Sequence, residues 1–170
     1  GEGVLAPYTL VAVDQGNFAI NNTYEFVRFT GQVSEAIGDD IQATFEDVTN
    51  WDGAWAAAMQ IKGQKFIILQ IPKALNAYGN QGITCLYDYR QKKWYNLYGW
   101  DGGVPSKWPG CSYEEIWGRR FVGGNGVIYE LDTEAYDNIG DVQRMLGRTA
   151  PMDAWGPSFV DNVRMRVKRG

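Results

Sequence analysis

The sequence predicts an all-β fold built from four-stranded antiparallel units of the kind that form β-propeller blades, together with one short helix. Three observations lead to this prediction. The 170 residues include 21 Gly, 7 Trp, 10 Tyr and 7 Phe, a composition typical of turn-rich sheets packed by aromatic side chains. Short aromatic and β-branched runs alternate with turn residues from Thr84 to Asp132. The predicted strands also recur in groups about 40 to 50 residues long, as propeller blades do.

Three short strands are predicted at the start of the chain, over residues 5–13, 18–20 and 24–29. The segments 14–17 and 21–23 separate them and are rich in turn-forming residues. The second segment also fits a glycosylation acceptor, but no secretion signal is visible, so we interpret it as a turn. The sequence begins with Gly1 rather than methionine, and we therefore expect an excised or processed piece.

One helix is predicted between residues 37 and 48, because apolar residues recur at spacings of four, four and three along a single helical face. These residues are Ile37, Ile41, Phe45 and Val48. Asp39 and Asp40 lie near the expected start, where carboxylates complement the helix dipole. We expect the helix to end before Asn50.

Four strands are then predicted in a row, over 54–61, 65–71, 83–89 and 93–98. The second is apolar enough to be buried on both faces, and Pro72 ends it. A further group covers 113–117, 119–123 and 127–131, with its turn at Gly124-Asn125-Gly126 and a fourth strand near 142–148.

The number of predicted strands accounts for about three blades, whereas a closed six-bladed propeller would need roughly 240 residues at this period. We therefore interpret residues 1–170 as a single β-rich domain, about three propeller blades of a larger assembly or chain. A sandwich of sheets is the alternative.

The sequence lacks the residues that several classes of enzyme and metal site require. The chain has no histidine, which removes the Ser-His-Asp and Cys-His systems and histidine metal ligands. Cys85 and Cys111 are too few for a structural zinc site, and we expect buried thiols in strands rather than a disulfide. No phosphate-binding glycine motif occurs. We therefore predict no enzyme activity and no cofactor.

Charge and hydropathy limit the classes of partner that we predict for the chain. The net charge of -4 argues against sequence-specific nucleic-acid binding, which needs a basic face. The basic residues near the C-terminus are interpreted as a solvated end or a charged strand edge; they are Arg144, Arg148, Arg164, Arg166, Lys168 and Arg169. No run approaches 18 apolar residues, so no membrane span is predicted.

The acidic residues are interpreted mainly as surface charge. Glu114 and Glu115 are neighbours in a predicted strand and point to opposite faces, so they cannot flank a glycosidic bond as an acid-base pair. The segment 132–140 is acidic enough for calcium but lacks the ligand pattern of an EF-hand loop, and a turn is favoured.

Five residues are candidates for contact with a partner or ligand: Trp51, Trp55, Trp100, Asp101 and Trp108. The predicted loop 100–110 would display its tryptophans for stacking on a sugar or for a protein contact. The alternative is that these rings cover the core between sheets. No metal site is predicted.

The order of motifs resembles the packaged-DNA stabilisation proteins of short-tailed bacteriophages, which are tail accessory or nozzle proteins built around a β-propeller. The resemblance extends from about residue 5 to residue 169. The motifs that carry it are Ala6-Pro7, a helix after Val33-Ser34, Leu69-Gln70-Ile71-Pro72, Leu86-Tyr87-Asp88 with Lys93-Trp94, Gly126-Val127-Ile128-Tyr129-Glu130-Leu131-Asp132 and Tyr136-Asp137-Asn138-Ile139-Gly140. The family would continue beyond the basic strand at 163–168, so the resemblance implies missing flanks.

The resemblance implies a structural role in the virion, at the head-tail junction or in the tail, after assembly in the host cytoplasm. Copies would form a homo-oligomeric ring that seals or extends the DNA channel and retains packaged DNA. The implied partners are other neck and tail proteins: a portal-side adaptor and tail needle or fibre components. The family has no catalytic residues to transfer. The alternative function is a carbohydrate-binding or glycan-processing propeller domain, with Asp101 as the carboxylate beside the tryptophan loop.

Overall fold

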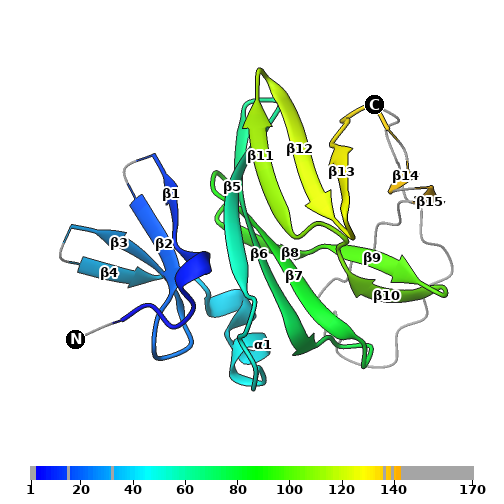
Figure 1. The fold of residues 1–170 in the computed structure, drawn as a ribbon. Helices are drawn as coiled ribbons and strands as arrows, with labels where there is room; N and C mark the ends of the chain where they lie inside the picture. Colours follow the sequence, from blue (N-terminus) through cyan, green and yellow to red (C-terminus); the bar gives the residue numbers. More distant parts are fainter. Residues whose placement is uncertain (1–2, 15, 32, 136, 139, 143–170) are drawn as a thin grey trace, which may run out of the picture.

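A computed structural model describes residues 3–142 except 15, 32, 136 and 139, and these residues form mainly antiparallel sheets (Figure 1). The all-β prediction is confirmed. Two sheets of four strands follow each other in the chain, and smaller sheets of two, three and two strands come after them. Among the described residues no helix is long and apolar enough to cross a bilayer.

The first sheet is a meander in the order β1-β2-β3-β4. Its strands are Val11–Val13, Gly16–Ile20, Phe26–Thr30 and Val33–Ala36. The prediction of one strand over 5–13 is wrong, because Pro7–Thr9 forms a 3-10 helix with Pro7 in its first turn. The hydroxyl of Thr9 donates to the Ala6 carbonyl oxygen at 2.7 Å and closes that turn. β4 was not predicted.

The predicted turn at 21–23 is present and is organised by the buried Asn21 side chain. Its Oδ1 accepts hydrogen bonds from the backbone N–H groups of Thr23 and Glu25, at 3.0 and 2.8 Å. Its Nδ2 donates to the Glu25 carboxylate. This carboxylate also accepts from the Thr23 hydroxyl, and the two hydrogen bonds, that from Asn21 first, lower the pKa of Glu25.

The predicted helix is much shorter than expected. Residues Asp39–Ile41 form a 3-10 turn (η2) and only Gln42–Glu46 (α1) are α-helical. Ile37 is not helical, because its N–H donates to the Phe26 carbonyl oxygen and its own carbonyl oxygen accepts from Nε1 of Trp94. Ile41, Phe45 and Val48 are nevertheless buried, so the apolar spacing identified the buried side chains correctly.

The central sheet is a second meander, in the order β5-β6-β7-β8. Its strands are Trp55–Ile61, Gln64–Leu75, Gln81–Asp88 and Lys93–Asn96. β6 is buried on both faces, as predicted, with Ile67, Ile68 and Leu69 fully inaccessible to solvent. It does not stop at Pro72, where a strand end was predicted, but continues to Leu75 through an irregularity in its pairing with β7.

The segment 100–110, predicted as a loop, is largely a hairpin. Tyr98–Asp101 (β9) pairs with Val104–Lys107 (β10). The next three strands, Ser112–Ile116 (β11), Arg119–Gly124 (β12) and Val127–Glu130 (β13), form the predicted group, with the turn at Asn125 and Gly126 in the left-handed backbone region. Asp137–Asn138 (β14) and Asp141–Val142 (β15) follow. Most of the predicted strands at 142–148 and 163–168 lies outside the described residues.

The central sheet lies between the first sheet and the later strands (Figure 1), and each of its faces has a core. The first face, which carries Ile67, Leu69 and Cys85, packs with Phe18, Ile20, Phe26 and Phe45 from the first sheet and α1. The second face, which carries Met59 and Ile68, packs with Trp108 and Val122. We call these the first face and the second face below.

Both cysteines are free thiols. Cys85 is buried in β7, as expected, and burial raises the pKa of its thiol to about 12. The expectation of burial is wrong for Cys111, which is exposed just before β11.

Candidate functional site

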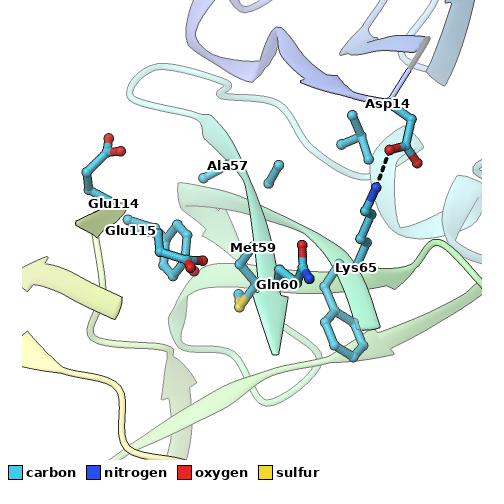
Figure 2. A pocket seen from close by; sticks show the side chains of 11 residues that line it. Asp14, Ala57, Met59, Gln60, Lys65, Glu114 and Glu115 are labelled. Carbon is cyan, nitrogen blue, oxygen red and sulfur yellow. Dashed lines mark hydrogen bonds and ion pairs between the residues drawn. The ribbon is translucent and has the colours of Figure 1, made fainter. Parts of the chain in front are cut away.

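A groove of about 430 Å³ lies where β1, β5 and β11, the first strands of the two four-stranded sheets and of the three-stranded sheet, meet (Figure 2). β5 contacts both β1 and β11. The lining residues come from the end of β1, from β5, from the start of β6 and from β11: Val13, Asp14, Ala57, Ala58, Met59, Gln60, Lys65, Phe66, Tyr113, Glu114 and Glu115. We call this the inner groove.

The two sides of the inner groove differ in charge. On one side Asp14 and Lys65 form an ion pair that joins the first sheet to the central sheet (Figure 2). On the other side Glu114 and Glu115 come from β11, and both are exposed. Three carboxylates therefore line the groove with one ammonium group, and the excess charge is negative.

Tyr113 also lines the inner groove and lies on the same strand as Glu114 and Glu115. Its hydroxyl oxygen is buried. Burial, followed by the nearby Glu115 carboxylate, raises the pKa of Tyr113. The Gln60 backbone and the Arg120 side chain act in the opposite direction and offset part of this rise in pKa.

The carboxylates of the inner groove do not face one another as a pair. Glu114 and Glu115 both line it, but Figure 2 shows their side chains pointing in different directions from β11. Among the described residues no three His, Cys, Asp or Glu side chains are placed to hold a metal ion. The features that remain are negative charge, small side chains on β5 and a strand edge.

The structure brings two of the five predicted contact residues together, around the buried Gln70 on the second face. Nε1 of Trp55 donates to Oε1 of Gln70 at 3.2 Å, and Nε2 of Gln70 donates to the carbonyl oxygens of Trp108 and Gly110 at 2.8 Å. Trp108 itself is 6% exposed, with its ring over Gly110, where a Cβ atom would lie 2.0 Å from the ring. Trp108 offers no ring face to a sugar.

The other three predicted residues lie apart from this cluster. Trp51 is half-buried and packs its ring against Phe45 and Tyr24, with centroid separations of 5.7 and 6.3 Å. Its Nε1 is buried and has no hydrogen-bond partner in the described part of the chain. Trp100 is half-buried on β9, and Asp101 is exposed at the end of that strand. None of the five lines the inner groove.

The most exposed tryptophan of the described residues was not among the predicted contact residues. Trp117 is 95% exposed at the tip of the β11–β12 hairpin, with φ of 54°. A bulky side chain is uncommon in this left-handed region of the backbone. Ile116, the residue before it, is also exposed. The prediction of a strand over 113–117 is wrong at Trp117, because β11 ends at Ile116 and Trp117 takes a turn conformation before Gly118.

No family model, no curated protein and no solved structure matches the chain.

Proposed function

We propose that the chain is a structural, protein-binding component of a short-tailed bacteriophage virion. In this proposal it lies at the head-tail junction or in the tail, where it helps to seal or extend the DNA channel and retain packaged DNA. The order of motifs along the sequence supplies the virion setting. The structure supports the proposal through its sheet arrangement and through one exposed side chain.

The sheet arrangement fits propeller blades. The first eight strands form two consecutive four-stranded meanders, each with its strands in sequence order. Their first strands, β1 and β5, meet the first strand of the three-stranded sheet, β11, around the inner groove. Blades of a propeller surround a central channel in this way. We propose that the two four-stranded sheets and the three-stranded sheet are blades of a propeller and that the inner groove belongs to their axis.

The exposure of Trp117 is the main observation in favour of a protein-binding role. Leaving a large aromatic ring almost wholly in water, on a left-handed backbone, has no benefit for the isolated chain. Tryptophan is also the residue type most enriched among the side chains that dominate protein interfaces. We therefore propose that the β11–β12 tip inserts into a neighbouring subunit or tail protein.

The charge of the chain suits a position along a DNA channel. A net charge of -4 and the carboxylates of the inner groove repel phosphate rather than hold it. The proposed partners are therefore proteins: other copies in a ring, the portal-side adaptor and the needle or fibre components of the tail.

The proposed function is tested by complementing a phage that lacks the gene for this protein with the Trp117→Ala variant. We expect the variant to fold normally, because the ring contacts solvent, and to enter particles poorly. Incorporation is measured by immunogold labelling of purified virions and by quantitative blotting. The matched control is Tyr8→Ala, which removes another highly exposed aromatic ring, outside the hairpin tip.

Gold confined to the head-tail junction in the wild type, and depleted by Trp117→Ala but not by Tyr8→Ala, is the expected pattern. Absence of wild-type protein from purified particles would refute the virion role. Normal incorporation of Trp117→Ala would refute the role of the hairpin tip. Oligosaccharide binding that is lost in Trp100→Ala would instead favour the carbohydrate-binding function.

A further inference from the structure

The edge of β5 that faces the inner groove is a free strand edge. β5 is the first strand in its sheet and pairs only with β6 in the described part of the chain. Its hairpin closes at Ile61 and Gln64 through a two-residue turn, in which Lys62 and Gly63 have φ of 49° and 78°. In such a hairpin the closing residues exchange backbone hydrogen bonds, and every second residue points its N–H and C=O groups outward.

Counting back from Ile61, the residues of β5 that point their backbone groups away from β6 are Gln60, Ala58 and Ala56. One contact confirms this assignment independently. Nε of Arg120 donates to the Gln60 carbonyl oxygen at 2.5 Å, from the side away from β6. The β5 edge therefore already accepts one hydrogen bond from outside its sheet, and no such bond is present at Ala56 or Ala58 among the described residues.

The side chains along this edge leave the backbone accessible. Residues 56–58 are three consecutive alanines, and two of them line the inner groove. β11 lies next to β5 without forming a ladder with it. The inner groove, of about 430 Å³, includes residues 57–60 of β5 and residues 113–115 of β11 in its lining.

The charge of the groove selects the kind of strand that would fit. Glu114 and Glu115 line one wall, and the only ammonium group in the lining, Lys65, is paired with Asp14. A strand with Lys or Arg at alternate positions would place its basic side chains toward Glu114 and Glu115, on the side of the second face, and its apolar side chains toward Val13, on the side of the first face.

We propose that the β5 edge is a strand-addition site for an extended segment of a partner protein that alternates apolar and basic residues. Backbone hydrogen bonds to Ala58, which lines the groove, and beyond the groove to Ala56 would supply affinity, and the carboxylates of β11 would supply selectivity. The proposal does not depend on the proposed virion role, because it rests only on the edge and its charge.

The test is a fluorescence-polarisation titration of the full chain with a labelled peptide, Val-Arg-Val-Arg-Val-Arg. We expect saturable binding that weakens with added salt, because exposed charge pairs are screened. The variant Ala58→Pro is expected to weaken binding by about tenfold, since it removes an outward N–H that the ladder with β6 does not use. Its fold is checked by circular dichroism and thermal unfolding.

Two comparisons separate strand addition from simple charge attraction. The double variant Glu114→Gln/Glu115→Gln should weaken binding about fivefold to tenfold and flatten the salt dependence, whereas Glu46→Gln on the exposed side of α1 should not. Two further peptides carry N-methyl groups at alternate residues, one at the odd positions and the other at the even positions. Their affinities should differ, because only one of the two sets of N-methyl groups lies on the peptide edge that pairs with β5.

Equal binding of the two N-methylated isomers, or unchanged binding by Ala58→Pro, would overturn strand addition. A second copy is the other possible occupant, since residues 163–168, Val-Arg-Met-Arg-Val-Lys, show the same alternation in the sequence. Sedimentation tests this alternative. If the chain self-associates with rising concentration, if Ala58→Pro abolishes this association, and if the peptide does not bind, the occupant of the edge is a second copy and the proposal of a partner segment is overturned.

Discussion

The two faces of the central sheet are held by different kinds of interaction. The first face is an apolar core, where Phe45 and Phe26 pack edge-on against Trp94, at centroid separations of 6.3 and 5.2 Å. The second face has a smaller apolar cluster around Met59, Ile68, Trp108 and Val122. Its centre holds the buried amide of Gln70, which hydrogen-bonds Trp55, Thr84, Trp108 and Gly110.

This difference has a physical consequence. Apolar burial is non-directional, so the first face holds the first sheet and the central sheet together but tolerates small changes in their relative position. Hydrogen bonds from one amide to two backbone carbonyl oxygens are directional, so the second face fixes the path of the chain from β10 to β11. We expect the first face to determine most of the stability and the second face to determine the position of the later strands.

The largest expected effect is that of Phe45→Ala on the first face. Phe45 is fully buried between Trp51 and Trp94, and emptying such a site costs about 3 to 5 kcal/mol of unfolding free energy. Urea denaturation monitored by tryptophan fluorescence measures the loss. The matched control is Phe66→Ala on the second face, where the ring is only half-buried and the loss should be smaller. A larger loss for Phe66→Ala would reverse the comparison.

Next in size is Gln70→Leu, which keeps the side-chain volume but removes the amide. The carbonyl oxygens of Trp108 and Gly110 then lose a buried donor, and we expect a destabilisation of about 2 to 3 kcal/mol. Among the backbone amides, we expect the hydrogen-exchange rate to change most at Trp108, whose N–H donates to the Thr84 hydroxyl beside Gln70.

The control for this prediction is Gln81→Leu, at an exposed position of β7, with an expected change within about 0.5 kcal/mol. If Gln70→Leu were as stable as the wild type, the amide would not organise the second face.

The buried thiol of Cys85 gives the first face a pH dependence. Burial raises its pKa from about 9 to about 12, so both folded and unfolded chains hold the proton below pH 9. Between pH 9 and 12 only the unfolded chain loses it, and stability should fall by about 1.4 kcal/mol per pH unit from this group. Unfolding free energies of the wild type and Cys85→Ala, compared from pH 8 to 10.5, measure the difference in slope.

Thiol labelling provides the companion measurement for the cysteines. At pH 8 iodoacetamide should modify the exposed Cys111 in the native chain, and Cys85 only after denaturation. Equal labelling of both thiols under native conditions, or the same alkaline slope in Cys85→Ala, would contradict burial of this thiol.

The smallest effect is expected for Glu130→Gln on the three-stranded sheet. Arg119 hydrogen-bonds the Glu130 carboxylate and lowers the pKa of that carboxyl group. The ion pair therefore stabilises the fold at pH values above the usual carboxyl pKa, and this stabilisation is lost as the pH falls through the lowered pKa. Both side chains are exposed, and we expect a small decrease in Tm that disappears at high salt. A large, salt-independent decrease would show that this sheet depends on the pair.

The sequence by itself determined the features that depend on neighbouring residues. The all-β class, the turns at Lys62-Gly63 and Asn125-Gly126 and the two-sided burial of β6 follow from local turn chemistry and from apolar runs. These signals need no knowledge of the partner strand. The apolar spacing of Ile41, Phe45 and Val48 also identified buried side chains, although it overstated the length of the helix.

The tertiary structure alone decided the features that join distant residues. Ile37 is drawn out of the predicted helix by Phe26 and Trp94, and Trp108 is buried by contacts with Gln70, 38 residues away. The inner groove likewise combines residues from β1, β5 and β11, which no local pattern could bring together. Side-chain burial and strand edges depend on which sheets pack against each other, and for this reason the contact residues expected from the sequence do not line the groove.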